Sequence, residues 1–188
     1  MAMRIRPVDY EEAPPKARAA YDAVVRNLGR ITNMKRTLLH SLPAFRALME
    51  WYSLRDTVQP FLGERLTNLF SHAISAENDC PICSTYFRKA LIESGENPDE
   101  LKLDEREELV IEFARQLAKP FGRVPDELYA RLAARFSDEQ IVALTAFGAM
   151  MVATNVINNA LEVEFDGYLE PYRGSGAAPA AAPADGEA

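Results

Sequence analysis

Signals that begin and end helices recur along this 188-residue chain, whereas signals for β-strands are nearly absent. Pro14 and Pro15 suit an opening helical turn, and Gly29 suits the left-handed conformation that ends a helix. Two capping boxes, in which a polar residue is followed three positions later by Glu or Gln, begin at Asp104 and Ser137. These signals predict an all-α fold of about six to seven helices.

Between these signals, apolar residues recur at intervals of three to four, as on one face of a helix. We expect Ser41 to cap one of the helices and Pro60 to break it. The last helix is apolar on most sides, so it should lie at the centre of the fold or at a subunit interface. The expected helices cover residues 17–28, 41–60, 63–77, 81–95, 104–119, 126–136 and 137–161.

The chain length fits one domain, which we place at residues 1–173. Residues 174–188 are rich in Ala, Pro and Gly, and we expect them to form a disordered tail because they have little apolar surface to bury.

Charge and hydropathy restrict the possible partners and location. The net charge of −7 argues against a nucleic-acid surface, which needs clustered Lys and Arg. Residues 1–7 run into charge and proline without the apolar segment of a secretory signal. The longest apolar candidate, residues 143–153, is too short to cross a bilayer. We therefore expect a soluble, cytoplasmic protein without nucleic acid or membrane as partners.

Cys80 and Cys83 form a C-x-x-C motif at a predicted helix start. The unpaired N–H groups and the dipole of a helix N-terminus favour a thiolate, and two thiols at this spacing can exchange between dithiol and disulfide. A pair of buried structural cysteines is the alternative. His40 and His72 lack the spacing of zinc ligands, so we expect no metal.

A redox thiol needs a proton donor and acceptor nearby. His72, on the helix before the dithiol, is one candidate because imidazole titrates near neutral pH, although a lone histidine on an apolar helix is often a core residue. Glu77 and Asp79 are also near in sequence, but polar runs between helices usually form loops.

Aromatic residues at helical spacing are more often core than pocket, so we expect core positions for six of them, with an apolar pocket near the dithiol as the alternative. These residues are Phe45, Trp51, Tyr52, Phe61, Tyr86 and Phe87.

Residues 68–83, with the sequence NLFSHAISAENDCPIC, resemble the core of the carboxymuconolactone decarboxylase superfamily, specifically its alkylhydroperoxidase AhpD-like, peroxidase-related branch. The resemblance extends over residues 4–172, through residues 28–33, 40–44 and 155–163. It implies an AhpD-like helical fold and subunits that associate as trimers or hexamers. It also implies that the cysteines reduce a small hydroperoxide or disulfide with electrons from a dithiol reductant protein, without a cofactor.

In this resemblance Cys83 attacks the peroxide and Cys80 resolves the product as a disulfide. The family's proton-relay Glu and His positions are Asn68 and Phe87 here, and neither side chain can transfer a proton. We expect His72, one turn after Asn68, to take over part of that task. The alternatives are a cofactor-free lyase of the decarboxylase type, and a non-catalytic oligomeric scaffold or redox sensor.

Overall fold

The computed structural model describes residues 3–174, and these residues form helices without any strand. The all-α prediction is therefore confirmed. The predicted tail lies outside the described residues from residue 175 onward. The elements are α1 (Pro15–Leu28), α2 (Asn33–Leu38), α3 (Leu42–Leu62), α4 (Glu64–Glu77), α5 (Pro81–Glu93), α6 (Glu105–Ala118), the 3-10 turn η1 (Pro120–Gly122), α7 (Asp126–Ala133), α8 (Asp138–Leu161) and the 3-10 segment η2 (Gly167–Tyr172).

The seven expected helices correspond to α1 and α3 to α8, and both capping boxes are present. The prediction that Pro60 breaks its helix is wrong, since α3 continues to Leu62. A proline in the last turn removes only one backbone hydrogen bond, and the helix ends at Gly63, whose φ of 83° favours glycine. Ser41 holds the expected N-cap position, but its side chain makes no capping hydrogen bond.

One helix, α2, has no counterpart in the prediction. Its six residues are too few to show a helical period, and it begins where the Thr32 side chain accepts a hydrogen bond from the backbone N–H of Lys35 at 3.4 Å. Helix α7 is shorter than expected, because it ends at Ala133 rather than near Phe136. A tight turn follows it, in which the N–H of Phe136 donates to the Leu132 carbonyl.

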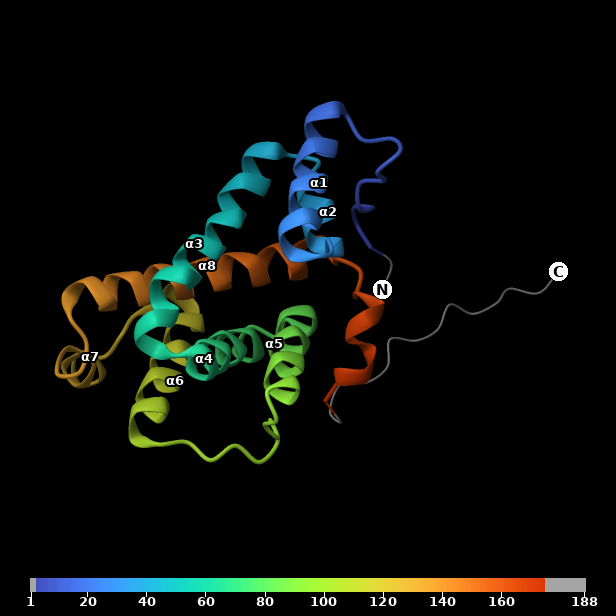
Figure 1. The fold of residues 1–188 in the computed structure, drawn as a ribbon. Helices are drawn as coiled ribbons and strands as arrows, with labels where there is room; N and C mark the ends of the chain where they lie inside the picture. Colours follow the sequence, from blue (N-terminus) through green and yellow to red (C-terminus); the bar gives the residue numbers. More distant parts are fainter. Residues whose placement is uncertain (1–2, 175–188) are drawn as a thin grey trace.

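Helix α8 runs across the middle of the fold and packs against α3, α4 and α6 (Figure 1). Gly148 allows this close packing, because a Cβ atom there would lie 2.5 Å from Leu117 and 3.1 Å from Phe70. By length and apolar composition, α8 is the one helix within residues 3–174 that could cross a membrane. It is central, as expected, while Val142 and Val156 on it stay exposed.

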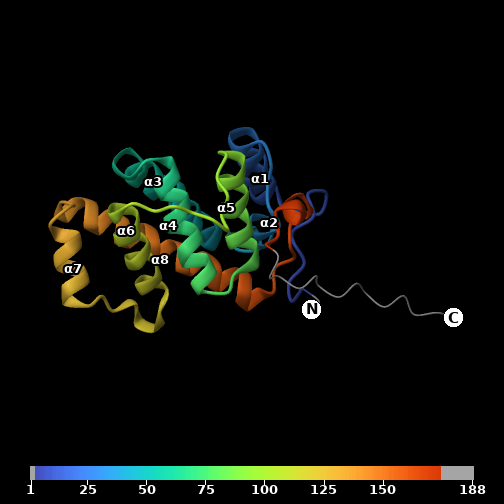
Figure 2. The same ribbon diagram turned by 90° about the horizontal axis from the view of Figure 1, so that it is seen from below.

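Helix α4 contacts α6 and also α5, the helix whose start carries the dithiol. Figure 2 shows α5 between α4 and the C-terminal η2, and both of these elements contact α5. Helices α1 and α2 pack on the N-terminal half of α3 around a smaller core that includes Val24, Leu38 and Phe45 (Figure 1). The start of α5 is therefore close to elements from both ends of the chain.

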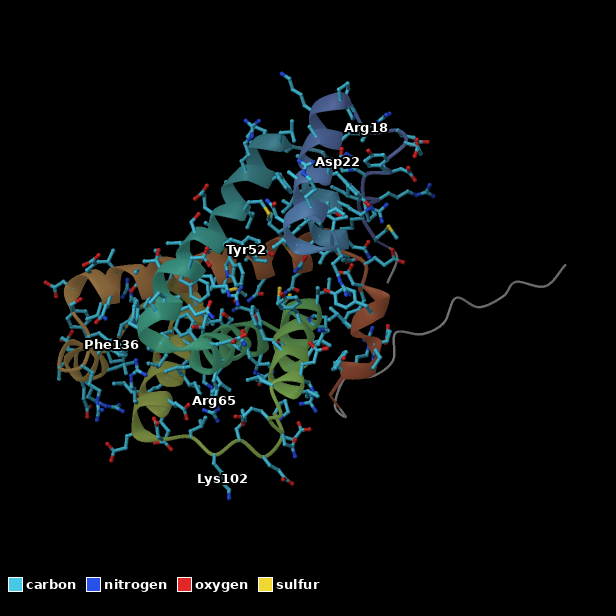
Figure 3. The ribbon with its side chains drawn as sticks, in the orientation of Figure 1. Arg18, Asp22, Tyr52, Arg65, Lys102 and Phe136 are labelled. Atoms are coloured by element: carbon cyan, nitrogen blue, oxygen red, sulfur yellow. The ribbon has the colours of Figure 1, made fainter. Side chains whose placement is uncertain are left out.

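Arg65 at the start of α4 anchors the long connection between α5 and α6. Its guanidinium bonds Glu96 at 2.7 Å, pairs with Glu107 of α6, and donates to the Lys102 carbonyl at 3.2 Å. Figure 3 shows Arg65 and Lys102 at this edge of the molecule. This network joins the start of α4 to the segment after α5. The other ends of these two helices meet at the dithiol.

Candidate redox-active site

A tight turn between α4 and α5 places the dithiol. Helix α4 ends at Glu77, and Asp79 takes a left-handed φ of 47° that reverses the chain. The N–H of Cys80 then donates to the Ser75 carbonyl at 3.0 Å, and Pro81 begins α5. The expected position at a helix N-terminus is confirmed, and Glu77 and Asp79 are exposed residues of the turn.

Asparagines from α8 hold this turn against the centre of the fold. Asn159 donates to the Asn78 carbonyl at 2.9 Å, and the amide of Asn155 donates to the Asn78 side-chain oxygen at 3.2 Å. Asn155 is fully buried. The stretch 155–163, which carried part of the family resemblance, therefore positions the cysteine pair.

Asn158, one turn of α8 after Asn155, contacts the sulfurs directly. Its amide Nδ2 lies 3.2 Å from Cys83 Sγ and 3.7 Å from Cys80 Sγ. Both cysteines are free thiols, with exposed fractions of 1% for Cys80 and 7% for Cys83. One amide nitrogen thus contacts two neighbouring sulfurs that are not bonded to each other. Sequence reasoning quoted Asn158 only within the resemblance and gave it no role.

The two thiols titrate as a coupled pair. Donation from the Cys83 thiol lowers the pKa of Cys80 to about 7, and the backbone N–H groups of Cys83 and Ile82 and the Asn158 amide act in the same direction against burial. Donation to Cys80 and burial raise the pKa of Cys83, and nearby Lys35 opposes that rise. The pair therefore releases one proton near neutral pH and retains the second, because two adjacent anions would repel each other.

Cys83 lines a cavity that opens to solvent, whereas Cys80 is not among the lining residues. Access to solvent and substrate thus favours Cys83, while the N–H groups at the helix start favour the thiolate on Cys80. Of the six aromatic residues considered above, four line this cavity; Phe45 and Phe61 pack in the cores instead. The four are Trp51, Tyr52, Tyr86 and Phe87.

Lys35 from α2 and Asp166 from the segment after α8 line the same cavity. Both are buried, with exposed fractions of 7% and 8%. Burial lowers the pKa of Lys35 and raises the pKa of Asp166. Sequence reasoning missed both residues, because neither a short basic run nor an acid in a C-terminal loop carries a recognisable signal.

His72 lies elsewhere on α4, half-buried, and it does not line the cavity with Cys83. Burial lowers its pKa, Arg88 and Arg115 add to this effect, and Asp99 opposes it. These neighbours keep the imidazole neutral at pH 7. A proton-transfer role for His72 stays a prediction, and within residues 3–174 no hydrogen bond or salt bridge joins it to the dithiol.

Asn68 and Phe87, the positions that the resemblance matches to a relay, lie beside the site. Both side chains are buried and line a second hollow, which shares Trp51, Tyr86 and Phe87 with the main cavity. Neither side chain can transfer a proton, while Glu64, Lys89 and Glu93 line the same hollow. Within residues 3–174, no group of three or more His, Cys, Asp or Glu side chains could hold a metal ion.

The arrangement of helices is that of AhpD-like peroxidase-related proteins. A peroxidase-related protein from Ralstonia eutropha JMP134, described as an alkylhydroperoxidase AhpD core, is 19% identical with a TM-score of 0.69, over 89% of this chain and 94% of that one. A peroxidase-related protein from Silicibacter sp. TM1040 is 15% identical with a TM-score of 0.71, over 87% and 93%.

The debrominase Bmp8, in a cysteine-to-alanine variant in complex with 2,3,4-tribromopyrrole, is 16% identical with a TM-score of 0.75, over 92% of this chain and 96% of that one. No family model and no curated protein matches the sequence. At these identities the likeness shows the fold. The AhpD-like helical fold that the resemblance implied is confirmed.

Proposed function

We propose that this protein is a thiol-dependent oxidoreductase that reduces hydroperoxides, or disulfides, with the Cys80–Cys83 pair. The observation that carries the proposal is the coupled dithiol at the start of α5, where one proton leaves near pH 7 and Cys83 faces a cavity. A structural pair of cysteines would need neither the shared Asn158 donor nor an opening to a cavity. The AhpD-like fold supports the same chemistry.

The reaction needs two steps. Cys83 gives its proton to the hydrogen-bonded Cys80 thiolate and attacks the terminal oxygen of the hydroperoxide. The O–O bond breaks, the alkoxide takes a proton, and an alcohol and a sulfenic acid form. The Cys80 sulfur then attacks the Cys83 sulfur, the S–S bond forms, and water leaves. The two thiols lose two electrons and the peroxide bond gains them. A dithiol reductant protein returns the pair to the reduced state, and we propose a trimer or hexamer as the working assembly.

A second candidate is the reductive removal of a halogen from a small aromatic ring. Trp51, Tyr52 and Phe87 provide an aromatic wall beside Cys83, and the debrominase Bmp8 has this fold. The dithiol would supply two electrons, and the products would be a carbon–hydrogen bond, a halide ion and a disulfide. Release of bromide from 2,3,4-tribromopyrrole in proportion to thiol loss is the measurement that tests this candidate.

The main proposal is tested by counting thiols before and after one equivalent of cumene hydroperoxide. We expect both thiols to disappear, the mass to fall by two hydrogen atoms, and dithiothreitol to restore both. The Cys80→Ser/Cys83→Ser double variant is the control and should leave the peroxide unconsumed. If both thiols stay reduced in excess peroxide, the peroxidase proposal is wrong, and disulfide exchange, the lyase and the scaffold or redox sensor remain as the alternatives.

A further inference from the structure

We propose that Lys35 and Asp166 form the acid–base end of the dithiol cavity, where Lys35 holds the charge of the Cys83 thiolate and protonates the alkoxide that leaves a bulky organic hydroperoxide. This inference rests on the proposed peroxidase function. It assigns the proton transfer that Asn68 and Phe87 cannot perform, and it names the class of substrate.

The first support is the position of the Lys35 ammonium group. The side chain is buried in the cavity wall, and within residues 3–174 its Nζ makes neither a hydrogen bond nor a salt bridge. Its Nζ lies over the ring of Tyr52, 5.6 Å from the centroid. A buried ammonium with no anion in direct contact is costly to keep. Asp166 acts on Lys35 from a longer distance, and a thiolate or alkoxide in the cavity would add an anion.

The second support is the carboxyl group of Asp166. Its Oδ1 accepts the backbone N–H of Asn33 at 2.9 Å, while its Oδ2 is buried without a hydrogen-bond partner among the described residues. Asn33 and Lys35 belong to the same turn of α2, so this bond holds the two groups together at one end of the cavity. An unpartnered carboxyl oxygen there can accept a proton and pass it on.

Few other titratable groups face Lys35. Tyr52 approaches from α3, Cys83 and Tyr86 from α5, and Asp166 from the segment after α8. Tyr52 is labelled in Figure 3, at the crossing of α3 and α8 above α5. Burial raises the pKa of Tyr52, so its hydroxyl stays neutral at physiological pH. Lys35 is therefore the one cation among these groups.

The proton balance closes around Lys35. Cys83 first gives its proton to the Cys80 thiolate, to which it is hydrogen-bonded. The Cys83 thiolate attacks the terminal peroxide oxygen, the O–O bond breaks, and the alkoxide takes a proton from Lys35 Nζ, which solvent then protonates again. The Cys80 thiol attacks the Cys83 sulfenic acid and its proton leaves with the hydroxide, so the products are a disulfide, an alcohol and water.

The rest of the cavity indicates the substrate class. Its walls are thioethers, aliphatic side chains and an indole, which suit an apolar body rather than hydrogen peroxide alone. A ligand with a hydroperoxy group at Cys83 would bury its carbon skeleton against these walls. They are formed by Met34, Leu48, Met49, Trp51, Ile82 and Met151.

The test compares Lys35→Met and Lys35→Arg with wild type, and uses Lys16→Met, an exposed lysine on α1, as the matched control. Two readouts are measured: the pH dependence of thiol alkylation by iodoacetamide, and the rate of disulfide formation with cumene hydroperoxide and with hydrogen peroxide. In Lys35→Met we expect the alkylation midpoint to rise by about one pH unit and the cumene hydroperoxide rate to fall about 100-fold. Lys35→Arg should restore the midpoint but not the rate, because guanidinium is too weak an acid.

The outcomes test Lys35, Asp166 and the substrate class separately. An unchanged midpoint and rate in Lys35→Met, with wild-type turnover intact, would overturn the role of Lys35. An unchanged rate in Asp166→Asn, which can still accept the Asn33 N–H, would remove Asp166 from the proposal. Equal wild-type rates with the two peroxides would overturn the substrate class. A wild-type protein inert to both peroxides defeats the peroxidase function itself, and the alkylation midpoint of Lys35→Met then still shows whether Lys35 holds the thiolate.

Discussion

The two ends of the cavity are built in opposite ways. At the dithiol end, Cys80 and Cys83 lie within one helical turn and share an amide donor, Asn158. At the other end, Asp166 meets the start of α2 across 133 positions of sequence, and a carboxyl oxygen and a lysine ammonium are left without partners. At the first end the sulfurs have a donor, and Asn158 Oδ1 is the atom left without a partner among the described residues. The second has groups that only a reacting molecule or a charged thiol can satisfy.

This difference indicates that electron transfer and proton transfer can be assigned to different parts of one site. The residues that exchange electrons must lie close together, and a helix start is sufficient to hold them. The residues that handle protons and charge can come from any element that reaches the cavity, because they need only face the reacting atoms. Variants at each end should therefore fail in different ways.

The largest expected effects come from the cysteines themselves. With Cys83→Ser, we expect peroxide turnover to fall by about a thousandfold or more, the scale of removing a nucleophile. With Cys80→Ser, one round of reaction should leave a sulfenic acid on Cys83 that dimedone traps, since the resolving thiol is absent. Mass spectrometry of the labelled peptide distinguishes the two variants. Dimedone on Cys80 in the Cys83→Ser variant would instead make Cys80 the attacking thiol, in line with its lowered pKa.

Loss of the shared amide should weaken the dithiol end without disturbing the other. In Asn158→Leu, we expect the lower thiol pKa to rise by about one unit, because two N–H contacts to sulfur are lost. Alkylation at neutral pH should then slow by about tenfold. Asn159→Leu is the control, since Asn159 bonds the Asn78 carbonyl and no sulfur. Equal effects in both variants would mean that the turn, rather than the amide contact, sets the thiol pKa.

At the other end, removing the unpaired charge should make the fold more stable while it impairs reaction. We expect Lys35→Met to raise the free energy of unfolding at pH 7 by about 1–2 kcal/mol. Burial lowers the pKa of Lys35, so the unfolded chain binds more protons between that lowered pKa and the ordinary value of 10.5. Wild-type stability therefore gains with rising pH in this window, and the advantage of the variant should shrink. Urea unfolding at several pH values checks this, and a less stable variant at pH 7 would contradict it.

The smallest expected effect concerns the short helix that carries Lys35. Thr32→Ala removes the N-cap of α2 and should cost about 0.5–1 kcal/mol in urea unfolding. Ser137→Ala, at the capping box of α8, should cost a similar amount. The two variants should differ in the peroxide reaction, because Thr32 supports the cavity and Ser137 does not line it. Equal rates would mean that α2 tolerates fraying without loss of the site.

The sequence predicted most of the fold because helix boundaries depend on local chemistry. The capping boxes at Asp104 and Ser137 are seen in the structure as side-chain and backbone hydrogen bonds within four residues. Pro60 misled the prediction, because whether a proline ends a helix depends on its distance from the last turn. Helix α2 was missed, because six residues stabilised by tertiary contacts show no period of their own.

The cysteine pair and its place at a helix start were determined by the sequence alone, since both depend on residues a few positions apart. Only the tertiary structure decided what surrounds the pair: Asn158 from α8, Lys35 from α2 and Asp166 near the C-terminus. These contacts join residues far apart in the chain, so no local spacing encodes them. The pKa values of buried groups, which set the chemistry of the cavity, depend on those contacts and on burial.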